Sequence, residues 1–143
     1  QKTLTKSIIN EFTEDEIKNF SSDIVISNAT IEHVGNYRNQ IKMIDNIIKL
    51  SRKLFVITTP NRFYPIDFHT KIPLIHWLPK KLHRKILNIL GLSYFSKEEN
   101  LNLLSKNDLK NMLNQFKNIR YDILDINLLK IKSNYVVIGE IIN

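Results

Sequence analysis

Asp23-Ile24-Val25-Ile26-Ser27 and Leu54-Phe55-Val56-Ile57-Thr58-Thr59 are the two runs of sequence that decide the fold. Both are short, apolar and rich in β-branched residues, a pattern that predicts strands buried on both faces. Residues 36–52, between them, repeat apolar side chains at helical spacing with charged residues in between. A strand, a helix and a strand within residues 23–59 predict one crossover unit, in which the two strands are parallel and adjacent.

The sequence after residue 60 predicts a long loop and a helix. Residues 61–79 hold three prolines, and the last of them, Pro79, favours the start of a helix that Gly91 can end in a left-handed cap. We expect the apolar residues of that helix to face inward; they are Leu82, Ile86, Ile89 and Leu90.

The last third of the chain predicts another helix and a hairpin. Ser105 and Asp108 have the spacing of a capping box, so a helix is expected to begin there. Residues 119–129 and 135–142 predict two strands, separated by about five residues, that pair antiparallel. We therefore expect one α/β domain over residues 1–143, with residues 62–98 inserted as a loop and helix cap.

Composition narrows the classes of function. The chain has 143 residues, enough for one domain with a core, and no cysteine, which excludes disulfides, thiolate metal sites and a cysteine nucleophile. The three glycines are too far apart to form a phosphate-binding loop. No apolar run approaches the ~18 residues of a membrane span, and no signal peptide is visible. A cytoplasmic location is the expectation.

The net charge of +7 is concentrated in the middle of the chain. Residues 63–95 carry five basic residues against one acid, together with three of the four histidines. Aromatic residues accompany them, so residues 63–92 favour, in this order, a lid over a substrate, an ordinary solvated helix, peripheral membrane contact through residues 71–90, and nucleic-acid binding. Nucleic acid comes last because no basic run is long or repeated. Within this stretch, His76 and His83 are expected at the surface.

The acid–base candidates follow the carboxyl ends of the two predicted strands, where open parallel sheets bind their ligands. Asn28, Thr30, Glu32 and His33 follow the first strand; Asn61, Asp67 and His69 follow the second. We expect both groups at one edge of the sheet. His69, oriented by Asp67 on an extended backbone, is the favoured general base, although a histidine that only bonds to backbone carbonyls fits the sequence equally well.

The segment from Asp23 to Val34, with its Glu-His-Val turn, and the later Thr-Pro-Asn at residues 59–61 resemble the C-terminal part of class I S-adenosylmethionine-dependent methyltransferases. The resemblance runs from about residue 10 to residue 142. It implies a Rossmann-like sheet closed by an antiparallel hairpin, with S-adenosylmethionine as cofactor and a small-molecule acceptor. The Gly-rich turn and the acidic residue that hold the cofactor in this family are absent from the sequence, which implies that they lie outside this chain.

The resemblance also implies roles for individual residues. Ser27, Asn28, Ala29 and Glu32 would lie at the cofactor. From their place and chemistry, His69, Asp67 and His33 are the residues expected in catalysis, and Asn61, Phe63, Tyr64 and Trp77 those expected to contact the acceptor.

Some relatives hold magnesium with Glu-x-x-Glu-His, but the first Glu position is Ala29 here, so no metal is expected. Glu32 is then expected to close the turn that enters the helix. A non-catalytic basic module for an anionic partner, a membrane surface or nucleic acid, and a relative that keeps only the fold remain alternatives. The oligomeric state is not predicted.

Overall fold

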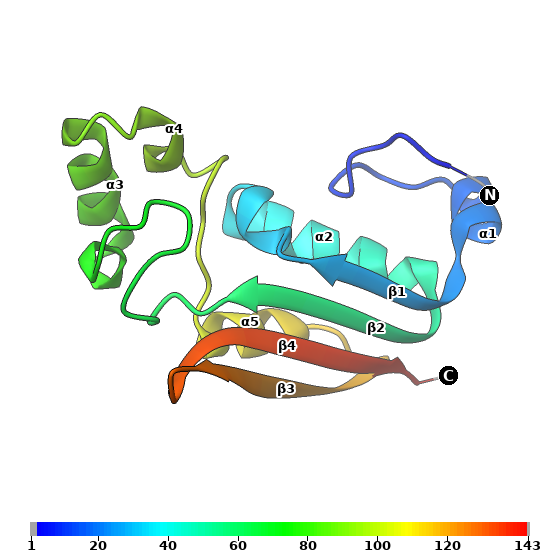
Figure 1. The fold of residues 1–143 in the computed structure, drawn as a ribbon. Helices are drawn as coiled ribbons and strands as arrows, with labels where there is room; N and C mark the ends of the chain where they lie inside the picture. The colour runs from blue at the N-terminus through cyan, green and yellow to red at the C-terminus, as the bar shows by residue number, and fades with distance from the viewer. Residues whose placement is uncertain (1–2, 143) are drawn as a thin grey trace.

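A computed structural model describes residues 3–142 and shows a four-stranded mixed sheet with its strands in the order β1-β2-β4-β3 (Figure 1). β1 (Ser22–Asn28) and β2 (Ser51–Pro60) are parallel neighbours, joined through α2 (Tyr37–Leu50). β2 pairs antiparallel with β4 (Ile131–Ile141), which pairs with β3 (Ile119–Leu128). The predicted crossover unit, the α/β class and the closing hairpin are confirmed.

The helix starts follow their local sequence. Asn36 caps α2 by accepting a hydrogen bond from the Asn39 N–H, and the predicted Ser105–Asp108 capping box begins α5 (Lys106–Leu113). A second capping box, from Thr13 to Glu16, begins α1 (Glu14–Phe20), which the weak pattern of residues 1–22 did not predict.

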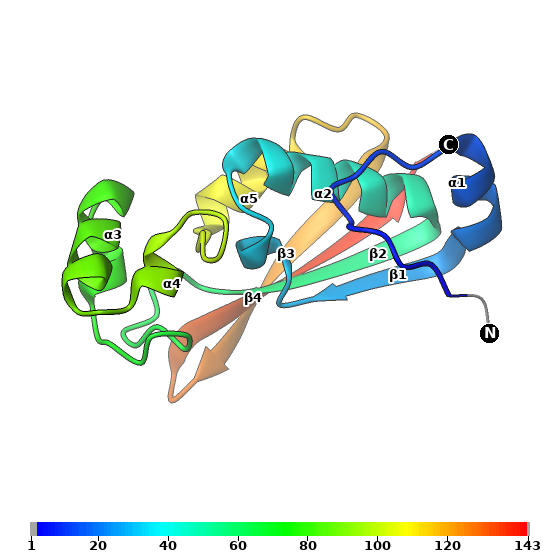
Figure 2. The ribbon, with the colours of Figure 1, turned by 90° about the horizontal axis from the view of Figure 1, so that it is seen from above.

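Helices α2 and α5 lie on one face of the sheet and form the core there (Figure 2). The contact between the strands is close at Gly139, which pairs with Phe55 across β2 and β4. A Cβ added at Gly139 would lie 2.0 Å from Phe55 Cζ, so a side chain at that position would displace the ring. The core includes Met43, Ile44, Ile47, Phe55, Ile57, Leu109, Met112, Leu113, Tyr135 and Val137.

The opposite face of the sheet is uncovered in the described part of the chain. Ile24 and Ile26 of β1 are 51% and 68% exposed, which corrects the prediction of a strand buried on both faces. The reason is that α2 and α5 lie on the other face. Three more aliphatic side chains alternate outward on this face, namely Leu124, Ile126 and Ile138.

The segment between β2 and α5 leaves the sheet at the carboxyl end of β2. It contains η2 (Ile75–Trp77), α3 (Lys80–Ile89) and α4 (Ser93–Ser96), and both ribbon views place α3 and α4 beyond the end of the strands (Figures 1 and 2). We call residues 61–104 the cap. Whether the cap is a separate insertion, as the sequence suggests, stays a prediction.

Helix α3 buries a different side from the one predicted. His83 and Leu87 are buried, whereas Leu82, Ile89 and Leu90 are 45–73% exposed. The cause is that α3 packs against η2 of the cap instead of the sheet. Gly91 ends this helix with φ +77°, as predicted.

The turn between β3 and β4 is shorter than predicted. Only Leu129 and Lys130 join the strands, and both adopt positive φ, 51° and 65°. No helix in the described residues is both long and apolar enough to span a bilayer.

Candidate functional site

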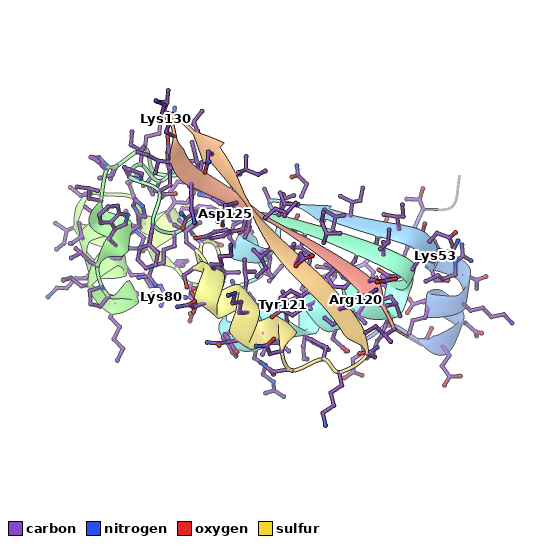
Figure 3. All side chains as sticks on the ribbon, turned by 90° about the horizontal axis from the view of Figure 1, so that it is seen from below. Lys53, Lys80, Arg120, Tyr121, Asp125 and Lys130 are labelled. Atoms are coloured by element: carbon purple, nitrogen blue, oxygen red, sulfur yellow. The ribbon has the colours of Figure 1, made fainter. Side chains whose placement is uncertain are left out.

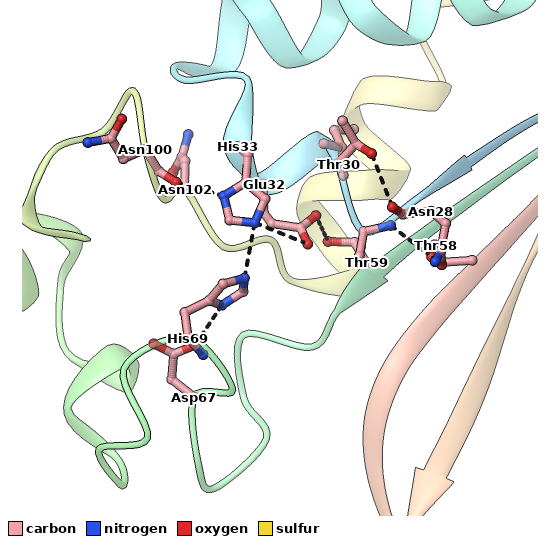
Figure 4. Close-up of polar contacts among 12 residues, drawn as sticks. Asn28, Thr30, Glu32, His33, Thr58, Thr59, Asp67, His69, Asn100 and Asn102 are labelled. Atoms are coloured by element: carbon pink, nitrogen blue, oxygen red, sulfur yellow. Dashed lines mark hydrogen bonds and ion pairs between the residues drawn. The ribbon is translucent and has the colours of Figure 1, made fainter. Parts of the chain in front are cut away.

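The carboxyl ends of β1 and β2 bring four predicted acid–base residues together (Figure 4). Glu32 and His33 lie in η1 (Ile31–His33), the short helix after β1, while Asp67 and His69 come from the loop after β2. The Nε2 atoms of His33 and His69 are 3.1 Å apart although the residues are 36 positions apart in sequence. The expectation that these side chains share one edge of the sheet is confirmed.

Asp67 fixes the imidazole of His69. Its Oδ1 accepts hydrogen bonds from His69 Nδ1 at 3.0 Å and from the His69 N–H at 3.1 Å, and its Oδ2 accepts one from Thr70 Oγ1 at 2.7 Å. The predicted contact is present, but it forms in a turn closed by the Lys71 N–H bonding to the Asp67 carbonyl, not on an extended backbone.

These contacts shift both ionisations. Burial opposes ionisation of Asp67, but the hydrogen bonds from His69 and Thr70 outweigh it and hold the pKa of Asp67 at about 2. The hydrogen bond to Asp67, partly opposed by burial, raises the pKa of His69 above its ordinary value. The pair therefore behaves as an oriented imidazole beside a permanent carboxylate.

The imidazoles of His33 and His69 face each other through their Nε2 atoms, and these two atoms cannot both carry only a lone pair. His33 Nδ1 lies 2.7 Å from the Asn100 carbonyl, which only accepts, so Nδ1 carries the proton. His69 Nδ1 likewise donates to Asp67. Two neutral rings would then turn two lone pairs toward each other at 3.1 Å. A shared proton or a bound cation resolves this conflict.

Glu32 completes the cluster from the sheet side. Its side chain is fully buried, and its Oε2 accepts a hydrogen bond from Thr59 Oγ1 at 2.9 Å. Its Oε1 lies 3.9 Å from His33 Nε2 and has no hydrogen-bond partner among the described residues. The sequence had suggested that Glu32 closes the entry to α2, but Asn36 does so, and Glu32 points to the end of β2 instead.

Glu32, His33 and His69 each offer one ligand atom, all within 4.8 Å of one another. One carboxylate oxygen and two imidazole nitrogens suit a divalent transition-metal cation. The expectation of no metal rested on Ala29, and sequence reasoning missed that the cap would supply His69 as a third ligand. That expectation stays a prediction, but the geometry gives a specific reason to test it.

Three of the four residues predicted at the cofactor lie at the end of β1, beside its open edge, whereas the fourth, Glu32, belongs to the histidine cluster. Asn28 Oδ1 accepts a hydrogen bond from Thr58 Oγ1, and the Ala29 N–H donates to the Thr58 carbonyl and hydroxyl. Ala29 has φ 48°, which turns the chain sharply into η1. Ser27 and Asn28 line a surface groove between β1 and α2. Their role in cofactor binding stays a prediction.

The residues predicted to contact substrate divide into two pairs. Asn61 is buried and bonded to the protein: its Nδ2 donates to the Lys132 carbonyl, and its Oδ1 accepts from the Phe63 N–H and the Tyr135 hydroxyl. The side chain of Tyr64 is also buried. Phe63 and Trp77 are 49% and 45% exposed, so they are the two that a ligand can reach from solvent.

His76 and His83 are buried at 1% and 9% exposure, which corrects the prediction that they lie at the surface. His76 is held inside because its Nε2 donates to the Tyr64 carbonyl at 2.7 Å. A loop carbonyl is invisible as a partner in the sequence, and this is why the burial was missed.

No family model and no curated protein matches the sequence. Solved structures do match. A magnesium protoporphyrin IX methyltransferase from Synechocystis PCC 6803, solved with bound SAH, shares 10% identity over 96% of this chain and 49% of its own, with a TM-score of 0.51. An O-methyltransferase family protein from Burkholderia thailandensis shares 12% identity over 98% and 35%, with a TM-score of 0.53.

The small RNA methyltransferase HEN1 shares 15% identity over 95% of this chain and 15% of its own, with a TM-score of 0.57. The chain thus spans half or less of the length of these structures. At such identities the comparisons show that the chain has the Rossmann-like fold of methyltransferases.

Proposed function

We propose that this chain forms the acceptor-facing side of an S-adenosylmethionine-dependent methyltransferase that acts on a small molecule. The observation that carries the proposal is the imidazole of His69, held by Asp67 at the carboxyl edge of two parallel strands. The methyltransferase-like fold supports it, as does the presence of SAM or SAH in two of the similar structures.

Methyl transfer needs little chemistry from the protein. The acceptor atom forms a bond to the methyl carbon while the sulfur–carbon bond breaks, and the positive sulfonium becomes a neutral thioether. An acceptor hydroxyl or amine must also lose a proton. His69 takes this proton on Nε2, and Asp67 stabilises the imidazolium through Nδ1. His33 Nε2, 3.1 Å away, is the nearest side-chain nitrogen that can share it.

We further propose that the donor-binding portion of the site is supplied by polypeptide outside this chain. The sequence contains no Gly-rich turn, and no described strand pairs with the outer edge of β1. Ser27, Asn28 and Ala29, at the end of that strand, would then contact the methionine end of the donor.

The test is a calorimetric titration of S-adenosylmethionine into this chain and into a protein extended upstream in its natural reading frame. We expect little heat from the first and micromolar affinity from the second, about −8 kcal/mol. Asp67→Asn in the extended protein should leave donor affinity unchanged, because Asp67 is assigned to the acceptor side. Absence of binding by the extended protein would refute the proposal.

A second candidate function for the same cluster is the binding of a divalent cation by Glu32, His33 and His69. It is favoured by the partnerless buried Oε1 of Glu32 and by the facing Nε2 atoms of the histidines. A cation bound there would lower the pKa of a coordinated acceptor hydroxyl.

A further inference from the structure

A second polar site lies under helix α3, apart from the Glu32–His33–His69 cluster. It is a small pocket, open to solvent, whose enclosed part has room for about one water-sized group. Its side chains include Arg62, His76, Lys80, His83 and Arg84. No acidic residue lines it. Figure 3 shows Lys80 at the cap end of the molecule, far from Lys53 at the other end of the sheet.

The three cations of this pocket are positioned before any ligand arrives. Arg62 donates to the carbonyls of His76 and Leu78, at 3.1 and 2.8 Å. Lys80 Nζ donates to Asn102 Oδ1 at 2.6 Å, and Arg84 donates to Glu98 at 2.9 Å. Each bond uses only part of the donor capacity of its cation, since an ammonium has three N–H groups and a guanidinium has five. The remaining donors are available to the pocket.

Two buried imidazole nitrogens in this pocket lack partners. His76 Nδ1 and His83 Nε2 have no hydrogen bond to any described residue. His76 Nε2 donates to the Tyr64 carbonyl and therefore carries the proton of the neutral ring. Nδ1 then has only a lone pair, unless the ring is protonated. Buried polar atoms without partners are rare and point to an absent ligand or water.

The backbone adds a further feature that favours an anion. Lys80, His83 and Arg84 belong to the first turns of α3, and no side chain caps the start of that helix. The free N–H groups of a helix N-terminus attract negative charge.

The local charge balance points the same way. Burial lowers the pKa of Arg62 and of Lys80, Arg84 lowers both further by repulsion, and Asp108 opposes the shift. Burial also lowers the pKa of His83 to about 4, opposed by Asp67 and reinforced by His76 and both arginines. The pocket thus holds three cations, with Glu98 bonded to Arg84 and Asp108 nearby, next to the neutral imidazole of His83.

We propose that this pocket binds a phosphoryl-type oxyanion, held by Arg62, Lys80 and Arg84, and that His76 or His83 takes up a proton when the anion enters. The enclosed part of the pocket has room for about one water-sized group, so one oxygen of the anion would enter it while the rest of the anion stays at its open mouth. The group could belong to a soluble phosphate compound or to a lipid headgroup. The inference does not depend on methyl transfer, and its test uses neither donor nor acceptor.

The experiment is a titration of inorganic phosphate into the full chain at pH 7, with sodium chloride at matched ionic strength as the control. Calorimetry in two buffers of different ionisation enthalpy measures proton uptake, and NMR of the imidazole nitrogens identifies the ring that is protonated. We expect saturable binding, a buffer-dependent heat, and a shift of the His76 or His83 nitrogens toward the imidazolium form.

Matched variants of α3 separate the pocket from general electrostatics. Lys80→Gln and Arg84→Gln should weaken phosphate binding at least about tenfold, because each removes a charged hydrogen bond. Lys85→Gln removes the same charge from an exposed position on the same helix and should change the affinity less than about twofold. Circular dichroism checks that each variant is folded.

Vesicles of phosphatidylcholine with and without phosphatidic acid distinguish the two sources of the group. Binding of acidic vesicles that inorganic phosphate displaces, and that Lys80→Gln weakens more than Lys85→Gln, would assign the pocket to a headgroup. Binding of inorganic phosphate without vesicle binding would assign it to a soluble compound. The proposal is overturned if phosphate does not saturate, if the histidine nitrogens do not shift, or if Lys80→Gln and Lys85→Gln weaken binding equally.

Discussion

Replacing His83 with glutamine should make the protein less sensitive to mild acid. Burial lowers the pKa of His83 from 6.5 to about 4 in the folded protein. Between these values the unfolded chain binds a proton at this position and the folded chain does not, so the stability of the wild type falls as the pH falls. The glutamine variant lacks this loss.

The size of the effect follows from the two pKa values. Relative to pH 7.5, the ionisation of His83 should lower the free energy of unfolding of the wild type by about 1.4 kcal/mol at pH 5.5 and about 2.5 kcal/mol at pH 4.5. All other ionisations are common to both proteins. The difference in free energy between wild type and His83→Gln should therefore change by these amounts.

Urea unfolding followed by circular dichroism measures this difference. Chloride salts of bis-tris and piperazine serve as buffers, because they contain no oxyanion that could occupy the pocket. Lys85→Gln is the matched control, since a lysine stays charged over this range and its difference from wild type should not vary with pH. If the His83→Gln and wild-type stabilities fall in parallel from pH 7.5 to 4.5, the argument for a neutral, buried His83 is wrong.

Three further perturbations test other contacts. Gly139→Ala should destabilise the protein by about 1–3 kcal/mol through its clash with Phe55. Phe55→Leu in the same chain should recover part of this loss. If urea unfolding shows that the losses of the two single variants add in the double variant, the close contact is contradicted. Asp67→Asn should lower the pKa of His69, which an NMR titration of the His69 ring measures; an unchanged pKa would show that Asp67 does not control it. Titration of Zn²⁺ or Mn²⁺ into metal-free protein should give one-to-one binding that Glu32→Gln weakens at least about tenfold, the smallest loss expected even for an outer-shell partner. Equal affinity in both proteins would exclude Glu32 as a ligand.

The parts of the fold that local chemistry determines were predictable. Two β-branched runs with an amphipathic helix between them gave the parallel pair, and Ser105 with Asp108 gave the start of α5. The edge at which the acid–base residues gather also followed from the sequence, because parallel strands place their carboxyl ends together.

What could not be predicted depends on contacts that no local sequence pattern specifies. The pairing of His33 with His69 requires the cap to fold back over η1, and the burial of His83 requires α3 to pack on η2. The exposure of Ile24 and Ile26 depends on which helices lie over each face of the sheet. Helical spacing shows that one side of α3 is apolar but not which side is covered, and η2, which directly precedes α3, covers the side that carries His83.

The uncovered face of the sheet has a practical consequence for every measurement above. Ile24, Ile26, Leu124, Ile126 and Ile138 present aliphatic groups to water on one side of the molecule. In a concentrated solution of the isolated chain, another copy is the nearest apolar surface that can shield them. Self-association should therefore increase with protein concentration. The binding stoichiometries measured above should be extrapolated to zero protein concentration and compared with and without a mild detergent.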